Sequence, residues 1–124
     1  MPNNLLTDET IPSLTKILSC NPIKDLDLTN NEIGCSGIKS LAKFISSASS
    51  GSGKCHLEKL TVSLNNIKQE GCESLCLALE NNKTIKYLDL SSNRLDHKSC
   101  AAIYQLLGVT TTLTVLIDYT DKHN

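Results

Sequence analysis

A Ser/Gly-rich stretch, SSASSGSGKC at residues 46–55, holds the residue pair that most suggests chemistry. The pair Gly53-Lys54 matches the end of a phosphate-binding loop, G-x-x-x-x-G-K-[ST], whose backbone N–H groups cradle phosphates. However, Ala48 stands where the first glycine is needed, and Cys55 stands where a Ser or Thr would hold Mg²⁺. The stretch also precedes a predicted strand instead of following one. We interpret it as a flexible insertion and expect high mobility at residues 47–54.

Six cysteines and three histidines are the side chains that could bind a metal or act as nucleophiles. Cys72 and Cys76 lie one helical turn apart, but no second ligand pair has the spacing that zinc requires. No Ser/His/Asp or Cys/His set recurs at a shared position. The sequence therefore predicts no metal, no cofactor and no catalytic residue, so we expect a protein that is not an enzyme. Cys72 and Cys100 take the position of Ile38 and are interpreted as small core residues, and the placing of the cysteines favours a reducing, cytoplasmic compartment.

The composition excludes several classes of partner. The 124 residues suffice for one domain, and the net charge of −1 gives no general attraction to nucleic acid. No window approaches the ~18 apolar residues of a membrane span, and no secretory signal is visible at the N-terminus. We therefore expect no nucleic-acid or membrane partner.

Three segments of the chain align without internal gaps and show which elements position these side chains. They begin at Ile23, Leu57 and Ile85, which are separated by 34 and then 28 residues. In each segment the apolar residues first alternate, as in a strand, and then recur with the spacing of a helix. The six additional residues of the first segment fall in the 46–55 stretch. An asparagine recurs eight residues after each start, at Asn31, Asn65 and Asn93.

The shared pattern L-x-x-L-x-L-x-x-N-x-L resembles that of leucine-rich repeats, and the 28-residue period is similar to the ribonuclease-inhibitor type. Related repeats occur in NOD-like receptors, tropomodulins and the Ran GTPase-activating protein. The resemblance implies an α/β solenoid with parallel strands on the concave face and helices on the convex face. It also implies that the asparagines satisfy backbone groups. We divide the single domain into a helical cap (1–22), repeats at 23–56, 57–84 and 85–112, and a terminal strand and tail (113–124).

The sequence also predicts the bounds, caps and inward residues of the helices. The cap is expected to form a helix over residues 10–19, with Ile17 among its inward residues. In the third repeat, Leu107 is expected on the inward stripe, and Gly108 just past the helix end. Ser36 and Asp96 are the predicted N-caps. The inward residues expected for the cap and the three repeats are Ile11, Leu14, Ile17 and Leu18; Ile38, Leu41 and Ile45; Cys72, Leu75 and Leu79; and Cys100, Ile103 and Leu107.

The residues between the inward leucines define a predicted binding surface on the concave face. Charged residues dominate its N-terminal part, whereas aromatic and aliphatic residues gather toward the C-terminus, as in protein-binding hot spots. The terminal strand either seals its own edge or pairs with a second copy, so we expect a monomer or a weak edge-mediated dimer. The predicted protein-binding residues are Asp25, Asp27, Lys59, Thr61, Leu64, Tyr87, Asp89, Val115, Ile117 and Tyr119.

The function predicted from this surface is a non-enzymatic protein–protein interaction module. One alternative is a regulator of an enzyme such as a GTPase or nuclease. For that role, the resemblance to the Ran activator draws attention to Arg94, the single arginine of the chain. Further alternatives are a structural, self-assembling module and a bacterial effector that acts in the host cytosol.

Overall fold

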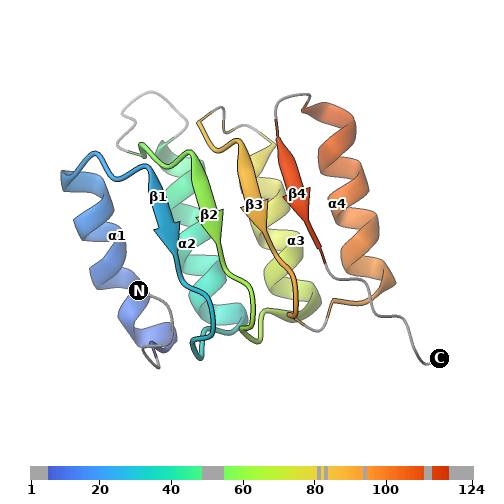
Figure 1. The fold of residues 1–124 in the computed structure, drawn as a ribbon, viewed down its shortest axis with the longest axis horizontal. Coiled ribbons are helices and arrows are strands. Elements are labelled where there is room, and N and C mark those ends of the chain that lie inside the picture. Colours follow the sequence, from blue (N-terminus) through green and yellow to red (C-terminus); the bar gives the residue numbers. More distant parts are fainter. Residues whose placement is uncertain are drawn as a thin grey trace.

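The computed structural model describes residues 6–48, 55–80, 82, 84–93, 95–110 and 113–117. Figure 1 shows strands side by side in one layer, with helices packed behind them. The strands are parallel and lie in the order β1-β2-β3-β4. This arrangement confirms the predicted α/β solenoid. The elements are a 3₁₀ turn at Asp8–Thr10, α1 (Ile11–Cys20), β1 (Asp25–Asp27), α2 (Cys35–Ala48), β2 (Lys59–Thr61), α3 (Lys68–Leu79), β3 (Tyr87–Asp89), α4 (His97–Val109) and β4 (Thr114–Leu116).

The core lies between the sheet and the helices and is almost entirely aliphatic. Leu26, Leu60 and Leu88 are direct neighbours in the sheet register, and all three are buried. Because each strand–helix unit has an apolar face that it cannot cover alone, stacking the units buries these side chains. No helix among the described residues is both long enough and apolar enough to span a membrane.

The asparagine column satisfies backbone groups, as predicted, and it also connects each repeat to the one before it. The side-chain nitrogen of Asn65 donates to the carbonyl oxygen of Leu28, in the preceding repeat, at 2.8 Å. It also donates to the carbonyl oxygen of Val62, in its own repeat, at 3.1 Å. The side-chain oxygen accepts from the N–H of Ile33 at 3.0 Å. With a further bond to the carbonyl oxygen of Ser63 at 3.1 Å, one amide thus satisfies four backbone groups in a buried turn.

The helix predictions hold in part. The carboxylate of Asp96 caps α4 by accepting from the N–H of Ser99 at 3.0 Å, and this bond lowers the pKa of Asp96. Ser36 is not an N-cap, because α2 already begins at Cys35. Gly108 lies inside α4, which continues to Val109.

Two apolar residues point away from the core, contrary to prediction. Leu107 is 38 % exposed and Leu106 is fully buried in its place. Ile17 is 51 % exposed, because Leu14 and Leu18 already form the buried stripe of α1. Adjacent apolar residues on a helix cannot all face the same side, so spacing alone left the choice between them open.

The register of β4 differs by one residue from the register that the repeat alignment predicts. Val115 lies opposite Leu88, and Leu116 lies opposite Asp89. The spacing from Leu88 to Val115 is 27 residues, one fewer than the 28 from Leu60 to Leu88. A slip of one residue turns every side chain of a strand to the opposite face. Val115 and Ile117 therefore pack against the core, and Leu116 takes the outward position.

Candidate protein-binding surface

The helices cover one face of the sheet and leave the other uncovered, as Figure 1 shows. We call this uncovered side the open sheet face; it corresponds to the predicted concave face. Its side chains are exposed or half-buried and form two rows across the four strands. The first row is Asp25, Lys59, Tyr87 and Thr114, and the second row is Asp27, Thr61, Asp89 and Leu116.

Two carboxylates of the second row are held by hydroxyl groups from the loop that follows their strand. The hydroxyl of Thr29 donates to Asp27 Oδ1 at 2.5 Å, and the backbone N–H of Thr29 donates to the same oxygen at 2.9 Å. The hydroxyl of Ser91 donates to Asp89 Oδ1 at 2.7 Å. The bonds from Thr29, the side-chain bond first, lower the pKa of Asp27. Asp27 is therefore ionised at neutral pH and fixed in orientation.

The first row carries a lysine held over an aromatic ring. Lys59 Nζ lies 5.2 Å from the centroid of the Tyr87 ring, within the range of a cation–π contact. One step toward the start of the strands, Lys24 Nζ and Glu58 Oε2 are 3.9 Å apart. Both of these side chains are more than half exposed, so the pair adds little stability. Opposite charges of neighbouring strands therefore compensate each other at this edge of the sheet.

A hollow of about 450 Å³ opens on the open sheet face between α1 and the first two strands. Ile17 and Leu14 of α1 form one wall, whereas Asp25, Asp27 and Lys59 line the strand side. An apolar wall beside carboxylates suits a partner side chain that is aliphatic and lies next to a basic group. The sequence pattern gave no sign of this hollow, because it placed Ile17 in the core.

Leu64 combines exposure with an uncommon backbone conformation. It is 51 % exposed, and its φ of 56° lies in the left-handed region. The equivalent residues of the neighbouring repeats, Asn30 and Ser92, have φ angles of 57° and 58°. A polar residue suits this turn better, because Asn tolerates the left-handed region and Leu does not. An exposed leucine here is consistent with the predicted binding role of Leu64.

The structure brings together most of the predicted surface residues but not all of them. Asp25, Asp27, Lys59, Thr61, Tyr87 and Asp89 share the open sheet face. Val115 and Ile117 do not, because the register of β4 turns them toward the core. Thr114 and Leu116 occupy the outward positions of that strand instead, and Leu116 is 46 % exposed. Tyr119 and Arg94 lie outside the described residues, as do residues 49–54 of the Ser/Gly stretch.

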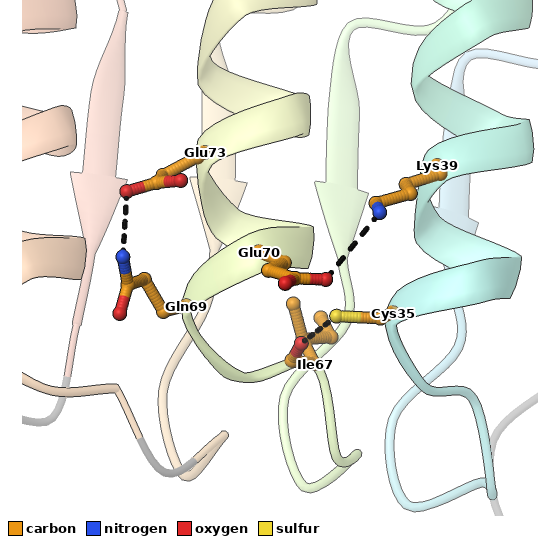
Figure 2. Close-up of polar contacts among 6 residues, drawn as sticks. All are labelled: Cys35, Lys39, Ile67, Gln69, Glu70 and Glu73. Atoms are coloured by element: carbon orange, nitrogen blue, oxygen red, sulfur yellow. Dashed lines mark hydrogen bonds and ion pairs between the residues drawn. The ribbon is translucent and has the colours of Figure 1, made fainter.

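On the opposite side of the molecule, polar side chains connect the helices, as Figure 2 shows. Lys39 of α2 and Glu70 of α3 form an ion pair, with Nζ and Oε1 3.4 Å apart. The thiol of Cys35 donates to the carbonyl oxygen of Ile67 at 3.2 Å. These contacts join successive repeats.

Cys72 is a core thiol of low reactivity. All six cysteines are free thiols. A hydrogen bond with Cys76, together with burial, raises the pKa of Cys72. Thiols of raised pKa are poor nucleophiles at neutral pH. In the described part of the chain, no three His, Cys, Asp or Glu side chains are grouped as metal ligands would be.

Comparisons with known proteins agree with this architecture. The chain is 31 % identical over 109 residues to mouse (Mus musculus) NACHT, LRR and PYD domains-containing protein 9C, covering 87 % of this chain and 10 % of that protein. Mouse NACHT, LRR and PYD domains-containing protein 4E is 27 % identical over 104 residues, covering 83 % of this chain. The chain thus spans about a tenth of the length of these curated relatives.

Solved structures and a family model complete the comparison. The leiomodin-1 actin-binding site 2 structure superposes with a TM-score of 0.79 at 23 % identity, and covers 96 % of this chain and 67 % of its own. At this identity, the likeness concerns the fold. The model of the leucine-rich repeat family matches residues 19–42, 53–76 and 81–103, more than half of the sequence. The chain therefore belongs to the leucine-rich repeat family.

Proposed function

We propose that this chain is a non-enzymatic module that binds a protein partner through its open sheet face. The observation that carries the proposal is the hollow between α1 and β1–β2, where exposed Ile17 lies beside the carboxylates of Asp25 and Asp27. The apolar wall of the hollow offers contact area to a partner, and the oriented charges determine the orientation in which the partner binds.

The rest of the open sheet face supports the same role. Tyr87 and Leu116 are aromatic and aliphatic groups on the exposed side of the sheet, and Leu64 lies at the adjacent turn. Asp89 stands between Tyr87 and Leu116 and is oriented by Ser91. Apolar contacts next to a fixed charge are typical of interface hot spots.

We also propose a reducing, cytoplasmic setting. The support is chemical: Cys72 and Cys76 are buried side by side as free thiols and replace aliphatic residues in the core. Such residues are inert where thiols remain reduced.

The test compares captured partners from the native cell for three versions of the chain. The surface variant is Tyr87→Ala with Asp89→Lys. The matched control, Leu77→Ala with Glu80→Lys, makes the same kind of change on α3 and at its C-cap residue, on the helical side of the molecule. We expect the surface variant to capture at least about tenfold less of a partner than the unmodified chain does, and the control to capture an unchanged amount. Circular dichroism must show that both variants are folded.

If all three folded versions captured the same proteins in equal amounts, the open sheet face would not be the binding surface. A separate variant, Ile17→Lys, tests the hollow: it removes the apolar wall and places a cation next to Asp25 and Asp27. If the hollow receives a partner side chain, this single change weakens capture without unfolding the chain.

A further inference from the structure

The turn that follows β2, in the middle of the array, carries a leucine that does not support the fold. Leu64 is 51 % exposed and belongs neither to the described core nor to the partly buried residues that pack against it. Its φ of 56° lies in the left-handed region, where the Cβ of a leucine comes too close to the following carbonyl oxygen. Leucine therefore costs stability at this position and buries little apolar surface.

The neighbouring repeats show that this turn does not require an apolar side chain. Asn30 after β1 and Ser92 after β3 hold the equivalent positions, with φ angles of 57° and 58°. Figure 1 shows the three turns side by side at the ends of the strands. They are joined through the backbone: the N–H of Leu64 donates to the carbonyl oxygen of Ser91 at 3.1 Å, and the N–H of Asn30 donates to that of Ser63 at 2.9 Å.

Neither of these bonds depends on the leucine side chain. Leu64 is thus strained and exposed, and polar residues take its place in the equivalent turns. Backbone strain that the fold does not require is typical of positions that contact a ligand or partner. The position lies between described strands of the array, so its exposure does not depend on where the sequence starts or stops.

Oriented carboxylates flank β2 just before this turn. Asp27 of β1 and Asp89 of β3 lie on either side of Thr61, which precedes Leu64 by three residues. Because neighbouring strands are about 4.8 Å apart, the Cα atoms of the two aspartates lie roughly 10 Å apart. Hydroxyl groups of the following loops hold both carboxylates. Lys59, the lysine of the open sheet face, lies in the other row. An apolar side chain thus lies next to two negative charges.

We propose that Leu64 is the apolar anchor for a basic segment of the protein partner. A segment that combines an aliphatic or aromatic side chain with Lys or Arg can cover Leu64 and place its cations next to Asp27 and Asp89. The apolar contact contributes affinity, whereas the opposite charges determine how the segment is oriented. This inference rests on the proposed function and adds to it the chemistry of the partner segment.

A random peptide library displayed on phage provides a defined probe. Peptides that bind the full chain are selected and synthesised, and their dissociation constants are measured by fluorescence anisotropy. We expect a selected family that combines Lys or Arg with Leu, Ile or Phe, and we expect its binding to weaken as salt is raised. Leu64→Asn should weaken the binding of this family by about tenfold or more.

Two further variants control for other effects. Leu64→Met keeps a flexible apolar side chain of similar size and should bind the peptides as well as the unmodified chain does. Leu77→Asn makes the same substitution as Leu64→Asn at an exposed leucine of α3, and should leave the binding unchanged. Because Asn suits the left-handed turn better than Leu does, weaker binding by Leu64→Asn cannot be attributed to unfolding. Circular dichroism checks that all variants are folded.

Two outcomes would overturn the proposal. The first is that no selected peptide family loses binding to Leu64→Asn, and the second is that the families that lose it are acidic or lack an apolar residue. The capture experiment separates this failure from failure of the proposed function. If Tyr87→Ala with Asp89→Lys loses a cell partner and Leu64→Asn retains it, the open sheet face binds the partner without Leu64 as its anchor.

Discussion

The side-chain oxygen of Asn93 accepts a hydrogen bond from the backbone N–H of Asn65, at 3.1 Å. The side-chain nitrogen of Asn93 donates to the carbonyl oxygen of Val62 at 2.8 Å, also in the preceding repeat. Each asparagine of the column therefore holds the turn of its neighbour as well as its own. It follows that damage to one of these side chains extends over two repeats.

Replacing the central asparagine, Asn65→Ala, should destabilise the whole domain. Asn65 is buried, and its loss leaves the carbonyl oxygens of Leu28 and Val62 and the N–H of Ile33 without this partner. We expect a loss of about 2–4 kcal/mol in the free energy of unfolding, since each buried unsatisfied group costs about 1–3 kcal/mol. Urea denaturation followed by circular dichroism measures it.

The adjacent residue provides the control. Asn66 is exposed, and its contribution to the stacking is its backbone N–H, which donates to Ile33. Asn66→Ala keeps that bond and should change stability by less than about 0.5 kcal/mol. Similar losses for both variants would show that the side-chain amide of Asn65 does not have the structural role assigned to it.

The sequence predicts this column well because its physical requirement is strict. A buried turn needs a side chain that both donates and accepts, and Asn at a fixed spacing meets that need. The register of β4 could not be predicted in the same way. In LTVLI, residues 113–117, apolar side chains occupy consecutive positions, so alternation does not choose which of them faces inward. The hollow beside Ile17 was missed for the same reason, because Ile17 and Leu18 compete for one inward position.

Replacing Leu64 with asparagine should stabilise the chain. The left-handed conformation at Leu64, with φ of 56°, disfavours a leucine side chain. Asn30 adopts the same conformation at the equivalent position of the first repeat. We expect Leu64→Asn to raise the free energy of unfolding by about 0.5–1 kcal/mol. The same change at exposed Leu77, inside α3, should lower stability, because asparagine is a poorer helix former. Chemical denaturation of both variants would reveal these opposite signs.

The Asp27 carboxylate should make the domain sensitive to acid. Its pKa is lowered from 3.8 chiefly by the hydroxyl of Thr29, so its contribution to stability is complete above the unfolded value and is lost as the pH falls through the folded pKa. Thr29→Val should raise the pKa of Asp27 toward 3.8. Carbon-detected NMR titration of the Asp27 carboxyl group measures the change. Ser91→Ala, which removes the equivalent hydroxyl beside Asp89, should leave the Asp27 titration unmoved.

The register of β4 can be tested by two adjacent substitutions. Val115 packs against the core and lies opposite Leu88, whereas Leu116 faces outward. Val115→Asp would place a charge against apolar side chains, so we expect it to destabilise the domain by about 1–3 kcal/mol. Leu116→Asp should cost less, about 0.2–1 kcal/mol, because its main effect is to place a second carboxylate opposite Asp89. Thermal unfolding of the two variants distinguishes the registers, because the register predicted from the repeat alignment buries Leu116 and exposes Val115. That register therefore requires the reverse order of stabilities.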